Sequence, residues 1–497
     1  MADLVVKGAH KMVEEPPAAL RLRDAVNLVV GIVVGTSIFR TTADVFQNTN
    51  SPAAAFAAWT LGGVLSLVGA LCYAELATTY PRSGGDYVYL SLAFGKWAGF
   101  LFGWVQLTAV LSSSIGTMAF AMADYARQVV ALPQGAEAPL AVLAVVGLSI
   151  VNSLGVSSGP RVQHVLTLAK VLGIACVLLA GAWLALAPQP TERSAAVNLR
   201  VAAHAPRVAT IAPTPDPRSV TPSPASFGLA LVFVLYAYGG WNDAAFVAAE
   251  VADRRRNVPR ALLGGLAAIT LLYLSMNAAY LAGLGVERAS RTATPAADLV
   301  AALAGPSGRR FVSALVMISA LGAINGMLLT GSRLYAALGA DHAALGWLGR
   351  TSAHGVPRGA LAAQASIVAA MILAVGTAAG RGAVDAALHA VGVAAVPWQR
   401  YLGGFETLLA ATAPLFWTML LATSTALIVL RRRNPDRQRP FSVPCYPWPP
   451  LLFAATCGFM LFHSLDYAGR LTLLALPPAL LGILLYAFSK RSPPQGG

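Results

Sequence analysis

The stretch GIVVGTSIFR, residues 31–40, lies in the first long apolar run of the chain and contains two glycines and two hydroxyl residues. A glycine costs roughly 1 kcal/mol relative to alanine in a helix interior. Inside a bilayer, each backbone group that unwinding frees must also find another partner. The stretch therefore predicts a helix that is broken at Gly35, Thr36 and Ser37, with N–H groups exposed at the start of its second half.

The composition of the chain is that of a membrane protein. The 497 residues are 57% hydrophobic and only 11% charged, with a mean hydropathy of +0.64, whereas about 25% of the residues of an ordinary soluble domain are charged. We therefore expect an all-α integral membrane protein with the lipid bilayer around it. The formal charge of +14 comes from short basic clusters beside apolar runs, which is typical of topology signals and argues against a nucleic-acid partner.

Windows of about 20 apolar residues divide the chain into spans. Twelve spans are predicted, near residues 24–46, 53–78, 97–128, 139–157, 161–187, 227–249, 259–285, 309–339, 359–378, 405–430, 448–465 and 470–488. The expected parts are a cytoplasmic tail at 1–23, five helices at 24–187, an extracytoplasmic Pro-rich linker at 188–226, five helices at 227–434, and two more helices with the C-terminus at 435–497.

Basic residues give the expected orientation of these spans. RRRNVPR at 254–260 and RRRNPDRQR at 431–439 lie directly beside predicted helix ends, where an excess of Lys and Arg marks the cytoplasmic side. Residues 1–23 lack the short apolar core and the cleavage site of a signal peptide. We expect both termini in the cytoplasm.

A second interrupted span occurs in LVFVLYAYGGWNDAAFVAAE at 231–250, where Gly239 and Gly240 are followed by Trp241, Asn242 and Asp243. Each half of the chain therefore begins with a glycine-interrupted span, which points to a transporter built from inverted repeats, with its substrate site at the breaks. Because five is an odd number of spans, the second half is expected to be inverted relative to the first.

Chemistry at the two breaks suggests the substrate. Free N–H groups at a helix start suit a carboxylate, and free carbonyls near Tyr236 to Gly240 can accept hydrogen bonds from an ammonium group. Together they fit a zwitterion, meaning an α-amino acid. The alternative for the first break is close helix packing through the small-xxx-small pattern of Gly31 and Gly35; the recurrence at Gly239 and Gly240 favours binding.

Several motifs in order carry a family resemblance. They are GIVVGTSIF, YAELATTYPRSGGDYVYLSLAFG at 73–95, YAYGGWND at 236–243, RRRNVPRAL at 254–262 and LGAINGMLLTGSRLYAALG at 321–339. From Asp24 to about Arg433 the chain resembles the amino acid, polyamine and organocation transporter superfamily, near the L-type amino acid transporters and their bacterial relatives. The resemblance implies the leucine-transporter type of fold, five plus five inverted helices with two more appended.

The resemblance also implies a binding mode at the breaks. It places the substrate carboxylate on the backbone around Thr36 and Ser37, and the substrate amine on carbonyls near Val33, Tyr236 and Gly239. The helix breaks themselves add Gly35 and Gly240 to the expected substrate-binding residues. The family commonly has glycine where this chain has Ser37, and often phenylalanine where it has Tyr236. The Tyr236 ring is expected to act as a gate over the substrate, with interhelical packing as the alternative.

Lys170 lies inside the fifth predicted span, nine residues after Arg161, which is roughly 13 Å along a helix. An ionisable group at this depth is a functional hypothesis by default. The resemblance places a lysine where sodium-coupled relatives bind sodium. Two roles stay open: proton coupling, or a permanent charge that braces the first break. Both predict transport without sodium.

Other polar residues of the spans receive weaker predictions. Glu75 and Glu250 lie near inner span ends, where gating or pairing with basic loops is expected. Trp241 and Asn242 are expected either to gate or to shape the second break, and the role of Asp243 is open. Asn325 matches a family motif, with a hydrogen bond between helices as the alternative.

Rival functions find less support in the sequence. A membrane-embedded enzyme would need a reactive motif, and the chain has no H-E-x-x-H, G-x-S-x-G or G-x-x-x-x-G-K-[ST] sequence; no cofactor or metal is expected. A polyamine or organic-cation transporter would favour an acidic site, so neutral amino acids are the favoured substrates. L-type relatives often pair with a glycoprotein through a cysteine in the loop that corresponds to ALPQGAEAP, residues 131–139, which has none. We expect no disulfide-linked partner, and a bacterial cytoplasmic membrane as the location.

Overall fold

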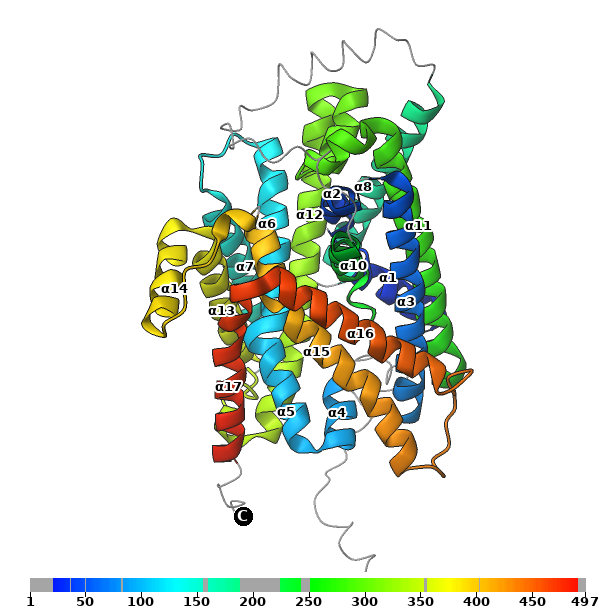
Figure 1. Ribbon diagram of the computed structural model, residues 1–497, viewed down its shortest axis with the longest axis vertical. Coiled ribbons are helices and arrows are strands. Elements are labelled where there is room, and N and C mark those ends of the chain that lie inside the picture. The colour runs from blue at the N-terminus through cyan, green and yellow to red at the C-terminus, as the bar shows by residue number, and fades with distance from the viewer. Residues whose placement is uncertain are drawn as a thin grey trace, which may run out of the picture.

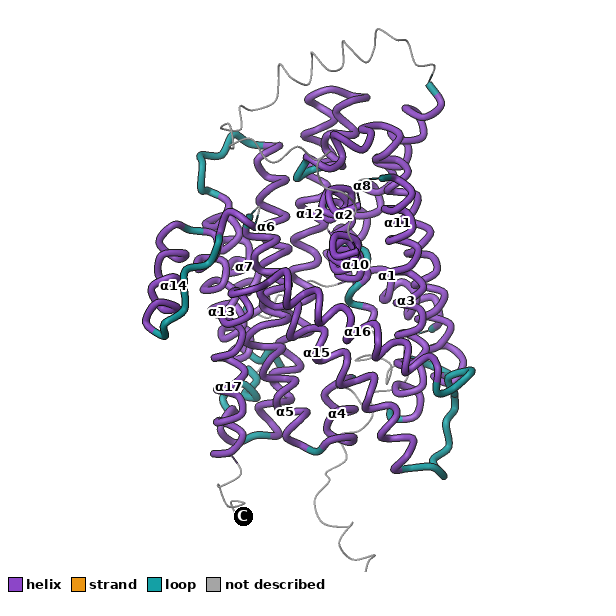
Figure 2. Tube along the Cα trace, viewed as in Figure 1, coloured by secondary structure: helices purple, strands orange, loops and turns teal. Residues whose placement is uncertain are grey.

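The chain folds into a helical bundle. The computed structural model describes residues 21–35, 37–49, 51–81, 84–154, 160–187, 224–242, 251–352, 355–401 and 403–489. Within these ranges the regular secondary structure is helical, with no β-strand, as Figure 2 shows. The prediction of an all-α protein is confirmed.

The helices follow the apolar runs of the sequence. In chain order they are α1 Leu22–Val33, α2 Thr41–Thr49, α3 Pro52–Thr79, α4 Asp86–Phe94, α5 Lys96–Val105, α6 Leu111–Val129, α7 Glu137–Ser153, α8 Pro160–Leu186, α10 Pro224–Tyr238, α11 Arg254–Arg291, α12 Pro295–Asp341, α13 Arg358–Gly376, α14 Ala378–Ala390, α15 Gly404–Arg433, α16 Trp448–Ala468 and α17 Thr472–Ser489. The short helices α4 and α14 were not predicted from the sequence.

Eight helical stretches among the described residues are long and apolar enough to cross a membrane. One of them runs from Lys96 to Val129 through the π-helical turn Gln106–Val110, which joins α5 to α6. The helices α7 and α10 are apolar but shorter. These lengths and compositions make the chain a multi-pass membrane protein.

Local sequence signals set where the helices begin and end. The Ser51 side chain caps α3 by accepting a hydrogen bond from the N–H of Ala54 (3.1 Å), and Pro52 occupies the first turn, where its missing N–H costs nothing. At the other end of the bundle, α15 closes with three arginines, Arg431, Arg432 and Arg433. Their positive charge is favourable beside the negative end of the helix dipole.

The two short helices α2 and α10 lie side by side near the centre of the bundle in Figure 1, between α12 on one side and α3 and α11 on the other. Helix α1 packs on α11, α6 packs on α12, and α15 packs on α16. Glycines allow α3 to approach its neighbours: a Cβ atom on Gly63 would lie 2.6 Å from Oγ1 of Thr270 on α11. This close packing holds the central helices in place.

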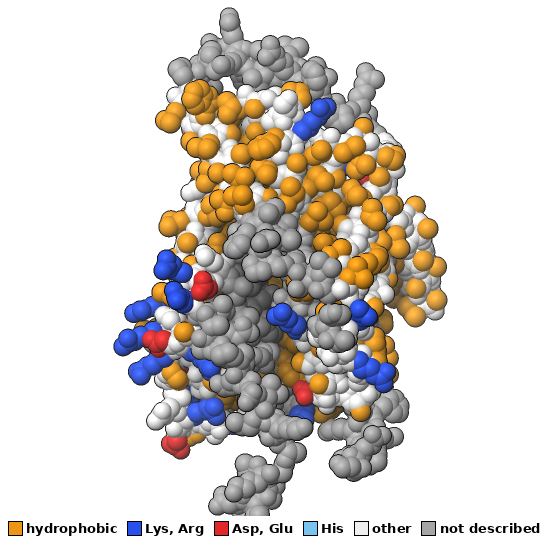
Figure 3. Space-filling model, turned by 180° about the vertical axis from the view of Figure 1, so that it is seen from behind, with side chains coloured by type: hydrophobic (Ala, Val, Ile, Leu, Met, Phe, Trp, Pro, Cys, Tyr) orange, Lys and Arg blue, Asp and Glu red, His pale blue; other side chains and the backbone are white. Residues whose placement is uncertain are grey.

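Charged side chains are unevenly distributed on the surface. Figure 3 shows Lys and Arg side chains gathered toward one end of the visible face, while hydrophobic side chains cover most of the opposite end. Many large apolar side chains are exposed, such as Leu179 at 71%, Trp183 at 62% and Leu271 at 68%. An exposed apolar surface of this kind suits contact with lipid.

Candidate functional site

The first predicted span is broken where the sequence indicates. Helix α1 ends at Val33, and the N–H of Gly35 turns back to donate to the carbonyl of Val33 (2.7 Å). A 3₁₀ turn, Ser37–Phe39, precedes α2, which begins at Thr41. Thr36 lies outside the described residues. The first N–H groups of a helix have no partner within it, so this turn presents hydrogen-bond donors at the break.

Close helix packing does not explain the glycines of this stretch. A Cβ atom added to Gly31 would have no heavy atom of the described residues within 4 Å, and the nearest atoms to one added to Gly35 belong to Val33 and Ser37 of its own loop. The described neighbours therefore give no support to the small-xxx-small alternative. The break follows from local backbone conformation rather than from the approach of a second helix.

The second break lies at the end of α10. This helix ends at Tyr238, the N–H of Gly239 donates to the carbonyl of Tyr236 (3.0 Å), and Gly240 has φ +99°, a conformation that glycine adopts without strain. Asp243 and Glu250 lie outside the described residues, so their predicted roles have no structural counterpart here. Both glycine-interrupted spans thus lose their helical conformation at the glycines.

A tyrosine of α11 joins the two breaks. The hydroxyl oxygen of Tyr273 lies 3.0 Å from the carbonyl oxygen of Val33 and 3.0 Å from that of Ala237, and the residue is fully buried. A hydroxyl has one proton, so it donates to one carbonyl or shares the proton between both. This role was not predictable from the sequence, because a tyrosine in an apolar run usually packs in a core.

The carbonyls predicted to bind the substrate amine already have partners. The carbonyl of Val33 accepts from Gly35 and Tyr273, which uses both of its lone pairs, and that of Tyr236 accepts from Gly239.

The Tyr236 ring meets Phe405 of α15 edge to face, with centroids 6.2 Å apart. The arrangement places a partly exposed aromatic ring directly beside the second break.

Lys170 of α8 reaches the first break. Its Nζ donates to the carbonyl of Gly31 at 2.8 Å, in the last turn of α1. The carbonyl is free for this bond because the residue four positions later, Gly35, has left the helix and donates to Val33 instead. A charged hydrogen bond therefore ties α8 to the broken span.

The other predicted residues of the second half are buried in packing positions. The Trp241 ring contacts Tyr73 edge to face, with centroids 5.0 Å apart, and also packs on Phe453. Asn242 is buried. Asn325 of α12 accepts a hydrogen bond from Asn152 of α7 (2.8 Å), so it links two helices away from the breaks.

A small pocket of about 20 Å³ lies beside the second break. Its walls come from α3, α10, α15 and α16, and they include Gly239, Trp241, Phe416, Trp417 and Phe453. Among the described residues that line it, none is ionisable, and Ser66, Asn242 and Thr456 supply its polar atoms. The pocket is suited to an uncharged and largely apolar group.

A charged cluster on the α2 side of the breaks was not predicted. The Arg40 guanidinium pairs with Glu406 of α15, lies 3.5 Å from a carboxylate oxygen of Asp124 on α6, and rests 5.2 Å from the centre of the Phe405 ring. Asp44 of α2 interacts electrostatically with both Arg40 and Glu406. The cluster therefore connects three helices around the second half of the broken span.

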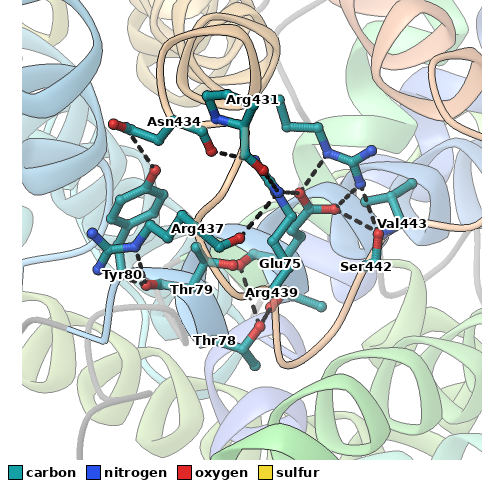
Figure 4. A network of polar contacts seen from close by, with 12 residues as sticks. Glu75, Thr78, Thr79, Tyr80, Arg431, Asn434, Arg437, Arg439, Ser442 and Val443 are labelled. Atoms are coloured by element: carbon teal, nitrogen blue, oxygen red, sulfur yellow. Dashed lines mark hydrogen bonds and ion pairs between the residues drawn. The ribbon is translucent and has the colours of Figure 1, made fainter.

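A second charged network lies at the other end of the bundle, where α3 and α15 end (Figure 4). Glu75 is buried and accepts hydrogen bonds from Nε of Arg431 (2.6 Å) and from the backbone N–H of Val443 (2.7 Å), with Arg439 at 3.5 Å. Arg437 donates to the carbonyl of Thr79. The predicted pairing of Glu75 with the basic segment is confirmed.

Comparison with protein families identifies the chain. The model of a family described as amino acid permease matches residues 20–482. The chain belongs to this family. Named relatives are transporters and exchangers, so this permease is not an enzyme, and it is an amino acid transporter of the membrane.

The permease is similar to proteins from bacteria and mammals. It is 26% identical to the serine/threonine exchanger SteT of Bacillus subtilis (strain 168), over 89% of this chain and 90% of that protein. It is 28% identical to the human cystine/glutamate transporter, over 88% of this chain and 79% of that protein. It is 30% identical to the large neutral amino acids transporter small subunit 2 of Rattus norvegicus, over 63% of this chain and 56% of that protein.

A solved structure shares the fold of the permease. A mutant of the manganese transporter of Eremococcus coleocola superposes with a TM-score of 0.55 at 11% identity, covering 96% of this chain and 97% of that chain. At this level of identity the similarity concerns the arrangement of helices alone. The permease therefore shares the helix arrangement of that structure.

Proposed function

We propose that the permease moves neutral α-amino acids across the membrane by alternating access, without sodium. The observation that carries this proposal is the meeting of two helix breaks through the Tyr273 hydroxyl, 3.0 Å from carbonyls of both breaks. A pocket whose described lining residues are not ionisable lies beside them. The donors at Gly35 to Ser37 bind the substrate carboxylate. The substrate amine replaces the Tyr273 hydroxyl at the Val33 carbonyl and binds the remaining lone pairs of the carbonyls at Tyr236 to Gly240.

The pocket beside Gly239 widens when the permease opens and then takes the side chain of the substrate. Burial of an apolar side chain there contributes about 25 cal/mol per Å² of surface removed from water. A charged side chain finds no ionisable partner among the described residues of the lining, and desolvating a charge without a partner is costly. These two effects favour neutral substrates over polyamines. The Tyr236 ring closes over the bound substrate.

Lys170 takes the place of a sodium ion. Its ammonium group is held by the Gly31 carbonyl in the first break, so a fixed positive charge stands where the resemblance expects a sodium site. Exchange and proton symport are both compatible with this brace. The name of the bacterial relative SteT, a serine/threonine exchanger, supports exchange.

The proposed architecture has twelve spans, in two inverted sets of five at 24–187 and 227–434 followed by two helices in 435–497. Both termini and the basic end seen in Figure 3 face the cytoplasm, and the linker 188–226 lies outside. The location is the cytoplasmic membrane of a bacterium. The permease works without a disulfide-linked partner, since residues 131–139 contain no cysteine.

Uptake by proteoliposomes tests the proposal. Vesicles containing the purified permease are loaded with unlabelled amino acid or left empty, and uptake of labelled serine, leucine, glutamate and putrescine is measured with and without sodium. Uptake of neutral amino acids that does not change with sodium is expected. A need for internal amino acid indicates exchange, and stimulation by a pH gradient indicates symport. Uptake of putrescine alone, or a strict sodium requirement, contradicts the proposal.

A further inference from the structure

The cluster around Arg40 buries more negative than positive charge. Arg40 is 7% exposed, Asp44 3% and Glu406 1%, so one guanidinium and two carboxyl groups are enclosed together. Asp124, whose side chain is 27% exposed, lies at the edge of the cluster and stays in contact with water. If both buried carboxyl groups are ionised, one negative charge inside the protein is uncompensated, and such a charge is costly to bury.

Hydrogen bonding points to the same surplus. Oδ2 of Asp44 and Oε2 of Glu406 are buried and accept no hydrogen bond within the part of the chain that the structure describes. A buried carboxylate oxygen without a donor has lost its hydrogen bonds to water, and no hydrogen bond within the protein replaces them. A carboxyl group that holds a proton has less need of donors, because its O–H is itself a donor. The surroundings of Asp44 and Glu406 therefore favour one proton held between the two carboxyl groups over the ionisation of both.

We propose that Asp44 and Glu406 together bind one proton from the outer solution when the outer side of the permease closes. The proposal rests on the proposed function, because it assumes alternating access with α2 on the outer side. The cluster joins α2, α6 and α15, so opening the path between these helices separates its members. In the open state water solvates both carboxylates and neither needs a proton.

A proton fits this place better than a metal cation. The guanidinium of Arg40 already occupies the centre of the cluster and repels a second cation. Among the described residues, no group of three or more His, Cys, Asp and Glu side chains is arranged to hold a metal ion. A proton adds no volume and needs no set of ligands.

The neighbouring charged groups already have partners. Arg127 of α6, which interacts electrostatically with Asp124, forms an ion pair with Glu137. On α6, Tyr125 donates to the carbonyl of Phe39 (2.7 Å). Tyr280 of α11 and Asp298 of α12 interact electrostatically with Tyr125. Asp298 is paired with Arg309 at 2.7 Å. The closing reaction therefore takes its positive charge from solution.

The sign of the pH effect follows from the proton count. The closed state binds one proton more than the open state, so a lower external pH favours closure. Each unit of rise in external pH lowers the equilibrium constant for closure by up to about tenfold. Closure traps substrate from outside. The apparent KM for external amino acid is expected to rise as the external pH rises between about pH 5 and pH 8.

The test measures exchange in proteoliposomes loaded with substrate, with the internal pH fixed and the external pH varied. Asp44→Asn and Glu406→Gln each remove the surplus carboxylate. Both are expected to give a KM that no longer changes with external pH, at a value near that of the wild type in acid. If one variant does not fold, as judged by the loss of its gel-filtration peak, the other variant tests the same prediction.

Asp385→Asn on α14 is the matched control. Although desolvation acts in the opposite direction, hydrogen bonds from Trp398 and from the N–H of Val396 hold the pKa of Asp385 below its ordinary value. It stays ionised over the range tested, so its variant is expected to keep the wild-type pH profile.

Each outcome bears on the inference separately from the function. A wild-type KM that is independent of external pH overturns the proton site while leaving amino acid transport intact. An unchanged pH profile in folded Asp44→Asn and Glu406→Gln also overturns it. Absence of amino acid uptake by the wild type at every pH instead defeats the proposed function, from which the inference starts.

Discussion

The ammonium nitrogen of Lys170 lies 2.8 Å from the carbonyl oxygen of Gly31, in the last turn of α1 before the first break. The bond fixes a cation at the end of a half-helix, where the free carbonyls carry partial negative charge. A lysine deep in a span is costly unless it has such a partner. The pair therefore gives a partner to the carbonyl that the break leaves without its helical hydrogen bond.

Replacing Lys170 by alanine is expected to reduce amino acid uptake about tenfold or more. The substitution leaves the Gly31 carbonyl unpaired, which costs about 1–3 kcal/mol for a buried acceptor, and it removes the charge. Uptake is measured in sodium and in sodium-free buffer, and added sodium is not expected to restore it. Lys96→Ala, at the start of α5, is the control and should transport as the wild type does. Normal uptake by Lys170→Ala would refute the bracing role.

Tyr273→Phe is expected to weaken transport while the protein remains folded. The change removes only the hydroxyl, so the carbonyls of Val33 and Ala237 lose their common donor, at a cost of about 1–3 kcal/mol. We expect a fall in the rate of uptake of about tenfold. The KM should also change, because in the variant no hydroxyl competes with the substrate amine for the carbonyl of Val33. Uptake kinetics over a range of amino acid concentrations measure both effects.

Tyr280→Phe is the matched control for this change. Tyr280 lies on the same helix, is equally buried, and its hydroxyl has no hydrogen-bond partner among the described residues. Its loss of a hydroxyl should leave uptake unchanged. Equal effects of the two substitutions would mean that the hydroxyl of Tyr273 has no special relation to the breaks.

The features that were predictable from the sequence are those that a short stretch of residues encodes by itself. Glycines in an apolar run marked both breaks, because glycine weakens a helix wherever it stands. Lys170 stood out because its charge conflicts with the surrounding apolar residues. The pairing of Glu75 with a basic segment followed from the positions of both near helix ends on one side.

Features that depend on distant contacts were not predictable in this way. Arg40 and Glu406 are 366 positions apart, and nothing in either local sequence specifies the partner. Tyr273 looks like an ordinary core residue until the fold brings α1 and α10 to its hydroxyl. The short helices α4 and α14 were missed because neither is long enough to give a membrane-span signal.

Glu75→Gln and Arg431→Gln are each expected to lower the thermal stability of the purified permease. Breaking a buried ion pair from one side leaves an uncompensated charge, at a cost of about 3–5 kcal/mol. The double variant removes both charges and should recover part of the loss. Thermal unfolding in detergent measures the three variants. Arg432→Gln, at the exposed neighbouring position, is the control; a similar loss there, or strictly additive losses in the double variant, would argue against the pair.

Gly69→Ala tests whether Trp241 shapes the second break. A Cβ atom at this position of α3 would lie 2.7 Å from Cη2 of Trp241 and 2.7 Å from Cε2 of Phe453, so the indole ring has to move. Overpacking of this kind typically costs about 1–3 kcal/mol, and displacement of the ring is expected to reduce both the unfolding temperature and the rate of uptake. Gly458→Ala on α16 is the control, since no heavy atom of the described residues lies within 4 Å of a Cβ atom there and alanine favours the helix. A loss of stability without any loss of uptake would assign Trp241 to packing alone, because the break would then keep its function with the ring displaced.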